Sequence, residues 1–333
     1  MEFKITSGHL DAEEWNSKIS RYPNKTAYHT YEWLDFIEKS QSLNKVIYEI
    51  LLDGKVQGYL PGFVIKKGPV KIFASPFPGW TTPYMGPLMS DSISQEAFFR
   101  GFKRLMKQER YHYAEFSNRA LDPELAKNHG YIIQEGVTYI TPVAKTPDDI
   151  LAGYKKSTRY YARKSIRDGI LEVETTLDYE RFLDHYYIQL QKVFMKSNMK
   201  PTYTKKRVKT LIESLLPTDR LMLSWVKYKE EIAACKIDII DDTWMYSFGS
   251  PSHPDYLRYR PNELLRFHVM CEAAKRGVQH YDMVGGGTYK SNYGGKKVPV
   301  YKFIYSKYGL YGIRNISRDI IRLKNKLSTK MMR

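Results

Sequence analysis

Apolar and polar residues recur along this chain with two different periods, and the change from one period to the other predicts its strands and helices. Residues 45–52 and 55–66 alternate with the two-residue period of a strand and meet at Asp53-Gly54, a pair typical of a tight hairpin. Residues 94–110 instead repeat apolar side chains every three or four positions, which predicts a helix with one buried face. Further strands are expected at 2–6, 70–74, 114–116 and 131–137, and further helices at 11–20, 30–40 and 122–128.

The second half of the chain shows a similar succession of elements. Pro261 and Asn262 start a helix that runs to about Arg276, and Gly277 ends it. The next strand, at 280–284, ends in three successive glycines, Gly285 to Gly287. Before this helix the pattern predicts helices at 148–168, 178–196 and 204–216 and strands at 221–228, 232–240 and 244–249, and after the glycines a strand at 300–305 and a basic helix at 314–327.

The length of 333 residues exceeds what a single hydrophobic core usually supports, so we expect two domains. The polar stretch at 141–149 is the predicted boundary, which gives domains of residues 1–145 and 146–333. Each half is expected to contain a mixed, largely antiparallel sheet flanked by helices, so the predicted fold class is α/β, of the α+β type, with two similar domains. The similar order of elements in the two halves suggests that one domain is a structural duplicate of the other, although the sequence itself shows no repeat.

Composition narrows the class of protein further. A hydrophobic fraction of 42% with 28 tyrosines is typical of an ordered globular chain, and no apolar run reaches the roughly 18 residues of a membrane span. The first residues lack the basic and apolar regions of a signal peptide. The only two cysteines, Cys235 and Cys271, belong to no CxxC or Cys/His cluster, so we expect no metal site, no disulfide framework and a cytoplasmic location.

The net charge of +17 is concentrated in three segments. Residues 155–167 contain six Lys or Arg and no acid, 200–209 contain five and none, and 296–333 contain eleven against one acid. These segments sum to +21, which leaves −4 for the rest of the chain. A localised positive field indicates an anionic partner, either a phosphorylated substrate, a nucleic acid or an anionic membrane, although solvated helix faces would also look like this.

One carboxylate stands out among the residues that could carry chemistry. Asp282 lies in a predicted strand just before the three glycines, which would let a substrate approach closely. At a strand end such a carboxylate could accept a proton from a substrate or orient it. Equally, an aspartate before glycines often caps the turn through its own backbone. Motifs of the common hydrolases, G-x-S-x-G, HExxH and the P-loop, are missing from the sequence.

Several short motifs occur in a characteristic order. They are YHTYEWL at 28–34, SPFPGWTTPYMGPL at 75–88, KKSTRYYARKSIRDG at 155–169, YDMVGGG at 281–287, YKSNYGG at 289–295 and YKFIYSKYG at 301–309. This order resembles the Fem-type peptidoglycan aminoacyl ligases (FemAB/FemX-like) and their relatives among the tandem GCN5-related (GNAT) N-acyltransferases. The resemblance implies two tandem GNAT-like domains, the first a degenerate copy that contributes the acceptor wall and the second the acyltransferase.

The segment before the helix at Pro261 bears on the acyl donor. Relatives that use acetyl-CoA have a Gly-rich pyrophosphate loop here, whereas this chain has Arg258, Arg260 and Asn262 and no glycine. Backbone amides therefore have less freedom to wrap a diphosphate, and Pro261 removes one more N–H. Both arginines could still bind a phosphate. The departure favours aminoacyl-tRNA over acyl-CoA as the donor, and both stay open.

Other side chains have expected roles, the first two by the resemblance and the rest by their own chemistry. Fem-type ligases have a basic helix beside the acceptor's diphosphate, and by this resemblance Lys156 and Arg159 are expected to bind that diphosphate. The alternative is that these basic residues only form a solvated helix face. Trp80 and Tyr84 lie on a Pro/Gly loop and are expected to stack on a sugar ring or to form a lid. Tyr293 or Lys290 is expected to hydrogen-bond the oxyanion, and Asn292 and Lys302 to line the same channel, although strand alternation alone also accounts for Lys302.

Together these features predict an N-acyltransferase that forms an amide on an amine of a phosphorylated or sugar-linked precursor of peptidoglycan or a surface polysaccharide. The donor is aminoacyl-tRNA or an acyl-CoA, and no tightly bound cofactor is needed. A lipid-linked acceptor would bring the enzyme to the membrane surface, with the basic helix at 314–327 as a contact. The other class of function is a non-catalytic protein that binds RNA or a membrane surface.

Overall fold

The computed structural model describes residues 1–6 and 11–312, so the predicted helix at 314–327 lies outside the described residues. The chain forms two compact units, Met1–Glu135 with Val300–Arg333, and Gly136–Pro299. The sequence instead suggested domains of residues 1–145 and 146–333. The division differs because strand β7 (Ile132–Pro142) runs through residue 135 into the second unit, and because the chain re-enters the first unit within strand β13 (Lys296–Ser306).

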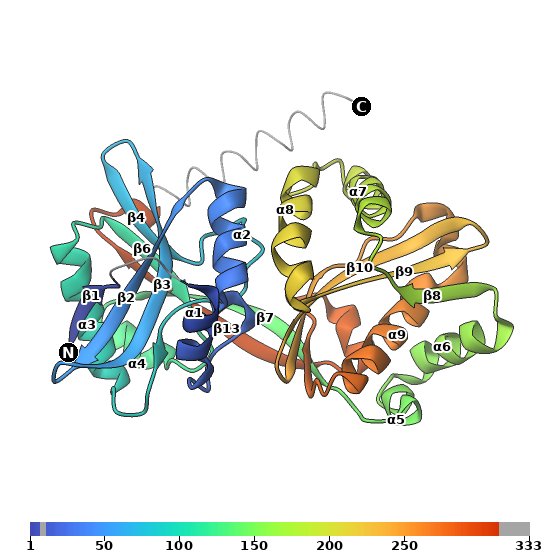
Figure 1. The fold of residues 1–333 in the computed structure, drawn as a ribbon, viewed down its shortest axis with the longest axis horizontal. Coiled ribbons are helices and arrows are strands. Elements are labelled where there is room, and N and C mark those ends of the chain that lie inside the picture. The colour runs from blue at the N-terminus through green and yellow to red at the C-terminus, as the bar shows by residue number, and fades with distance from the viewer. Residues whose placement is uncertain (7–10, 313–333) are drawn as a thin grey trace. The chain divides into compact units, whose positions relative to one another are not determined.

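The first unit is a mixed sheet with helices (Figure 1). Its strand order is β1-β2-β3-β4-β6-β13, and every neighbouring pair is antiparallel except the parallel pair β4–β6. Asp53 and Gly54 both have positive φ, at 51° and 74°, which is the turn that a two-residue hairpin needs. The remaining bounds are β1 (Glu2–Ile5), β2 (Asn44–Leu52), β3 (Lys55–Lys67), β4 (Val70–Ser75), β5 (Leu88–Met89), β6 (Tyr113–Ser117), α1 (Ala12–Ser20), α2 (Tyr31–Gln41), α3 (Gln95–Gln108) and α4 (Pro123–Asn128).

The second unit has the same arrangement with different segments. Its strand order is β7-β12-β11-β10-β9-β8, and the pair β11–β12 is parallel while the other pairs are antiparallel. Parallel neighbours need a crossover, and α9 (Pro261–Lys275) supplies it here as α3 does in the first unit. The predicted fold class, with two similar mixed domains, is confirmed. The strands are β8 (Leu171–Thr175), β9 (Leu221–Tyr228), β10 (Glu231–Asp241), β11 (Trp244–Gly249) and β12 (His280–Asp282).

The helix predicted at 148–168 is in fact two helices. They are α5 (Pro147–Ala152) and α6 (Lys156–Asp168), and α7 (Tyr179–Met195) and α8 (Lys205–Leu215) follow as expected. The break occurs because Lys155 has an extended ψ of 150° and its N–H bonds to the carbonyl of Asn292 at 2.9 Å, outside its own helix. A tertiary hydrogen bond thus overrides the local helical pattern.

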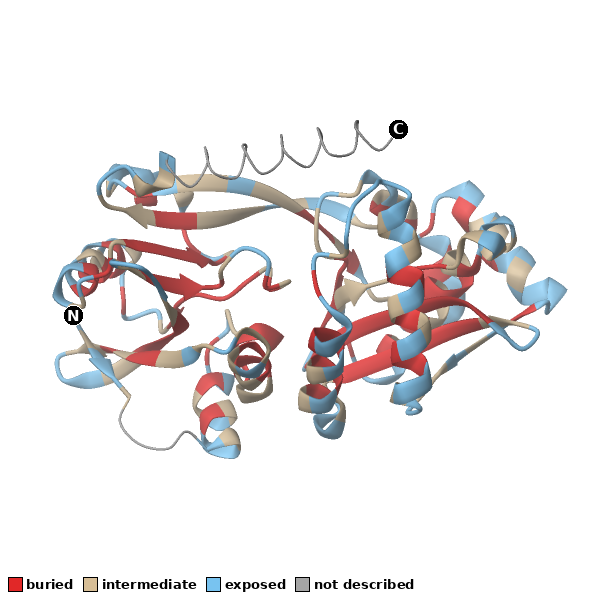
Figure 2. Ribbon diagram, turned by 90° about the horizontal axis from the view of Figure 1, so that it is seen from above, coloured by how far each residue is buried: buried red, intermediate tan, exposed pale blue. Residues whose placement is uncertain are grey.

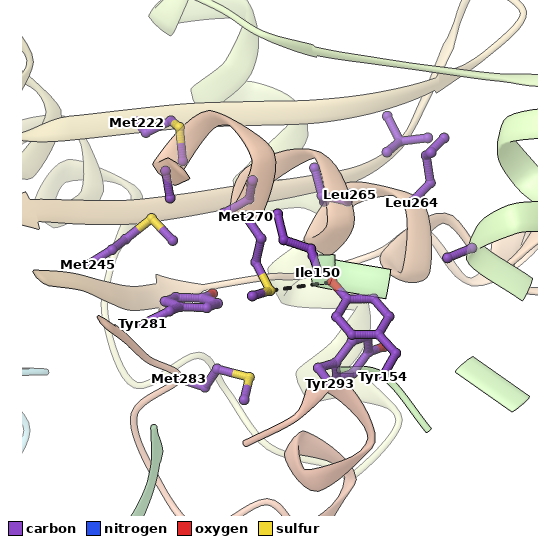
Figure 3. Packing of buried hydrophobic residues seen from close by; sticks show 14 of the residues in the cluster. Ile150, Tyr154, Met222, Met245, Leu264, Leu265, Met270, Tyr281, Met283 and Tyr293 are labelled. Carbon is purple, nitrogen blue, oxygen red and sulfur yellow. Dashed lines mark hydrogen bonds between the residues drawn. The ribbon is translucent and has the colours of Figure 1, made fainter. Parts of the chain in front are cut away.

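The core of the second unit fixes the start of α9 against the end of β12. Buried residues concentrate on the strands and on the inner faces of the helices (Figure 2). Figure 3 shows Met270 of α9 next to Tyr281, and Tyr154 next to Tyr293. Leu265 and Met283 belong to the same cluster. The Tyr154 hydroxyl donates to Met270 Sδ at 3.4 Å. This packing joins the start of α9 and the end of β12 in one hydrophobic cluster.

Candidate active site

The site begins where the chain enters α9. Arg260 has a left-handed φ of 58°, and Pro261 occupies the first turn of the helix. The Arg260 side chain makes no capping hydrogen bond to this helix. Pro261 has no N–H and the Glu263 N–H donates to the Arg260 carbonyl at 3.2 Å, so this helix start attracts an anion mainly through the positive end of its dipole.

A cavity of about 820 Å³ lies at this helix start, within the second unit. Side chains from the beginning of α6, the 3-10 turn at Pro254–Tyr259, α9 and the second 3-10 turn at Thr288–Tyr293 enclose it. Polar and charged groups provide much of the lining. The lining residues are Ser157, Thr158, Tyr161, Ser250, Leu257, Arg258, Arg260, Pro261, Asn262, Glu263, Arg266, Tyr289, Asn292 and Tyr293.

Arg266 is the buried cation of this cavity, only 5% exposed. Its guanidinium lies over the ring of Tyr293 at 4.5 Å and near that of Tyr289 at 5.7 Å, and Nη1 donates to Met283 Sδ at 3.4 Å. Nε has no hydrogen-bond partner among the described residues. Burial lowers the pKa of Arg266, but the surrounding tyrosines outweigh it and the pKa lies above its ordinary value. The side chain is a permanently charged donor directed at the cavity.

Glu263 brings a carboxylate to the same wall, three residues before Arg266 on α9. It is half-buried, and burial raises its pKa although Arg260 Nη1 lies 3.6 Å from the carboxylate. Next to it, Asn262 donates Nδ2 to Ser252 Oγ at 2.7 Å, and its buried Oδ1 has no partner in the described part of the chain. The cavity therefore offers acceptors for a cation as well as donors for an anion.

Arg258 and Arg260, predicted to bind a phosphate, both line the cavity. The Arg258 guanidinium donates to the Tyr259 hydroxyl at 2.9 Å, and that of Arg260 lies over the Tyr161 ring at 4.3 Å. Stacking fixes the two planar groups while leaving N–H donors for a ligand. Asn262 and Asn292, also predicted, lie in the same lining.

The glycine turn after β12 is held from both sides by Asp282 and Lys290. Asp282 is completely buried, and its carboxylate accepts from Thr138 Oγ1 at 2.5 Å and from the Val284 N–H at 2.8 Å. Lys290 donates Nζ to the carbonyls of Val284 and Gly285, and burial, with the nearby charge of Arg266, lowers its pKa to about 8. Neither belongs to the cavity lining, whereas Tyr293 does.

We expect Asp282→Asn to lower stability rather than to abolish transfer. Asparagine can still accept from the Val284 N–H but loses the charge-assisted bonds, which costs about 1–3 kcal/mol. Transfer should stay within about tenfold of wild type, measured as initial rate at a temperature where both proteins are folded. A loss of a thousandfold or more with unchanged donor affinity would instead identify Asp282 as the proton acceptor.

The basic residues predicted on α6 lie near the cavity but outside its lining. Lys156 is exposed and Arg159 half-buried, while their neighbours Ser157 and Thr158 line the cavity. The preceding Lys155 donates Nζ to Ser291 Oγ at 3.2 Å, which ties the start of α6 to the second 3-10 turn. The start of α6 is thus one wall of the site.

Trp80 and Tyr84 do not offer faces for a sugar, which corrects that interpretation. Both are buried in the first unit, where Trp80 packs edge-on against Phe63 at 5.2 Å and Tyr84 packs against Tyr28 at 6.2 Å. Because both rings are buried in the core of the first unit, neither is accessible for stacking on a sugar. Lys302 also lies in the first unit, on β13 opposite Ser117 of β6.

Two residues of the site, Arg266 and Glu263, were missed by the sequence analysis. Arg266 lies among Leu264, Leu265 and Phe267, and it is four residues after Asn262, which places both on one side of α9. An arginine within the apolar part of a helix is the signal that could have identified it, since arginine is almost never fully buried without a partner.

Other kinds of site find no support in the described residues. Across residues 1–6 and 11–312, no three His, Cys, Asp or Glu side chains gather as a metal ion would need. In the same part of the chain, no helix has both the length and the apolar character that crossing a membrane requires.

Comparison with known proteins identifies the class of this site. Residues 152–293, which include the whole cavity, match the sequence model of the Acetyltransferase (GNAT) domain. No curated protein sequence matches the chain significantly. The chain therefore carries an acyltransferase domain of the GNAT type in its second unit.

Solved structures with similar folds extend over almost the whole chain. FemX aligns with a TM-score of 0.73 at 16% identity, covering 94% of this chain and 99% of FemX. The C-terminal domain of a putative lysylphosphatidylglycerol synthetase from Agrobacterium fabrum gives 0.57 at 10% identity, covering 92% and 95%. A tandem GNAT protein of the clavulanic acid pathway gives 0.54 at 9% identity, covering 91% and 98%. The predicted resemblance to Fem-type and tandem GNAT proteins is confirmed at the level of the fold.

Proposed function

We propose that this chain transfers an aminoacyl group from an aminoacyl-tRNA to an amine of a phosphorylated or sugar-linked cell-wall or surface-polysaccharide precursor. The acceptor and donor are proposals, whereas the acyltransferase class comes from the GNAT domain. The observation that carries the proposal is the cavity at the start of α9, because it combines three arginines with a half-buried carboxylate.

The charges of the cavity fit an aminoacyl ester better than an acetyl thioester. Arg258, Arg260 and the positive end of the α9 dipole suit the phosphates of the donor in either case. Glu263 and the free Oδ1 of Asn262, however, suit a cation, and an acetyl group has none. An aminoacyl group carries an ammonium beside its carbonyl, which would lie against these two acceptors.

The proposed chemistry is attack by the acceptor amine on the ester carbonyl carbon. The C–N bond forms, the ester C–O bond to the ribose breaks, the nitrogen loses a proton and the ribose oxygen gains one. Arg266 and the Tyr293 hydroxyl, which lie together in the cavity, would stabilise the negative charge that develops on the carbonyl oxygen. Lys290, which lies in the same 3-10 turn as Tyr293, and Asp282 would act by holding the glycine turn that precedes it.

The acceptor would approach along the start of α6. Lys156 and Arg159 lie on this helix next to two residues of the cavity lining, so a diphosphate bound to them would bring its linked amine toward the ester. The reaction would take place in the cytoplasm, at the membrane face if the acceptor is lipid-linked.

Donor binding tests this proposal through Glu263. We expect charged tRNA to raise the thermal midpoint of the wild-type protein, with an effect that fades as salt rises, and acetyl-CoA to leave it unchanged. Glu263→Gln should weaken binding of charged tRNA by about tenfold or more, because hydrogen bonds to charged groups contribute about 1.5–3 kcal/mol. Affinities for charged tRNA and for the same tRNA with its aminoacyl nitrogen acetylated measure the role of the ammonium.

Wild type should prefer the free ammonium, and Glu263→Gln should lose that preference. Glu272→Gln is the matched control, since Glu272 is on the same helix but pairs with Lys275 at 2.7 Å, away from the cavity. Stabilisation by acetyl-CoA that survives salt would make the donor an acyl-CoA and overturn the proposal.

A further inference from the structure

The solvent-facing side of α7 carries apolar residues where polar ones are usual. Ile188 and Met195, seven residues apart and therefore on one face, are 48% and 69% exposed, while Phe182 and Tyr186 face the core. Val193, in the last turn, is also exposed but lies on the other side of the helix, toward that of Phe182 and Tyr186. An apolar side chain alone on a surface needs no explanation, but several together mark an interaction site.

The same surface continues into the turn after α7. The carbonyl of Phe194 accepts from the N–H groups of Ser197 and Met199, both at 3.0 Å, and Asn198 has a left-handed φ of 50°. The turn is therefore a defined structure, and it presents Met199 at 56% exposure. Three of the large exposed apolar side chains among the described residues, Ile188, Met195 and Met199, therefore lie toward this end of α7.

Two exposed lysines flank these apolar side chains, in a stretch of the sequence that is basic. Between Asp184 and Glu213 the sequence has seven Lys or Arg and no Asp or Glu. Lys196 and Lys200 directly follow Met195 and Met199, and both are exposed. We call Ile188, Met195, Met199, Lys196 and Lys200 the α7 tip.

We propose that the α7 tip docks on the surface of an anionic lipid bilayer, with its apolar side chains inserted between headgroups and its lysines on lipid phosphates. Exposed apolar residues flanked by lysines are typical of a protein surface that contacts a membrane interface. Lipid fits better than RNA, because RNA is recognised by arginine and stacking aromatics, and this surface has methionine and isoleucine instead. This contact is separate from the cavity and does not depend on the identity of the donor.

Vesicle binding by the full chain tests the docking. The purified protein would be sedimented with two kinds of vesicle. One is phosphatidylcholine alone, and the other is phosphatidylcholine with about 30% phosphatidylglycerol, which gives an anionic surface. We expect binding to the anionic vesicles and little to the neutral ones. Lys196→Gln with Lys200→Gln should lower the partition coefficient about 30-fold, since each lysine near an anionic surface contributes about fivefold.

The apolar contribution separates lipid from other polyanions. Met195→Ser with Met199→Ser should lower vesicle binding about tenfold or more while leaving the lysines in place. The matched control is Lys4→Gln with Ile5→Ser, an exposed lysine and apolar residue elsewhere, which should bind vesicles like wild type. Because all these side chains are exposed, thermal midpoints should stay within a few degrees, as about 0.5 kcal/mol or less is expected for such changes.

Either of two results would overturn the proposal. One is vesicle binding by the methionine pair variant equal to that of wild type. The other is a protein that shows no preference for anionic vesicles but binds a transfer RNA, with an affinity that the lysine pair variant lowers and the methionine pair variant does not. That result would make the surface an RNA contact.

Discussion

Arg266→Met is expected to lower kcat/KM for acyl transfer by about two to three orders of magnitude. Removing one preformed donor to a developing oxyanion typically has an effect of this size. Arg266 meets the requirements of such a donor, because it is buried, lies over Tyr293 and has an Nε without a partner in the described chain. The measurement is the rate of amide formation under subsaturating donor, with folding checked by circular dichroism.

Two further variants distinguish the effect of the Arg266 charge from that of its planar shape, and catalysis from donor binding. Arg266→Lys keeps the charge but loses the planar group that stacks on Tyr293, so it should recover only part of the activity. Arg258→Met removes an arginine that is exposed at the cavity, and it should raise KM for the donor while changing kcat by less than about tenfold. Equal rates for Arg266→Met and wild type would exclude Arg266 from the transfer step.

The architecture followed from the sequence because its local signals agree with one another. The hairpin at Asp53-Gly54 and the start of α9 at Pro261 appear where turn and capping chemistry predict them. Where prediction and structure differ, a distant contact decides. The hydrogen bond from Lys155 to Asn292 divides a continuous helical pattern, and the second half of β7 pairs with β12, which is more than one hundred residues away.

The site was only partly visible for a related reason. Arg258, Arg260, Asn262, Asn292 and Tyr293 occur in loops or at helix ends, where polar residues attract notice, and they line the cavity. Arg266 and Glu263 are spaced like ordinary helical residues, so only the tertiary structure shows that they face a cavity. Trp80 and Tyr84 illustrate the opposite case, since loop composition predicted exposure and the fold of the first unit buries both.

A buried ion pair in the sheet of the second unit is the other place where a single substitution should have a large effect. Lys236 and Asp238 are both completely buried on β10, with Nζ 2.6 Å from Oδ1. Lys236 also donates to Ser247 Oγ at 3.0 Å, and Asp238 accepts from the Tyr281 hydroxyl at 3.0 Å. Burial lowers the pKa of Lys236 to about 8 and raises that of Asp238. Each charge is therefore tolerated in the core only because of the other.

Lys236→Met should lower the free energy of unfolding by about 3–5 kcal/mol, because it leaves the Asp238 charge buried without its partner. Asp238→Asn should have a similar effect by isolating the lysine, whereas the double variant should lose much less than the sum of the two. Urea unfolding of all four proteins measures this coupling. The surface pair of Arg100 and Glu96 is the control, since an exposed pair 2.7 Å apart should contribute less than about 1 kcal/mol. Additive losses in the buried pair would mean that each residue stabilises the sheet through its other hydrogen bonds, to Ser247 and Tyr281, and not through the ion pair.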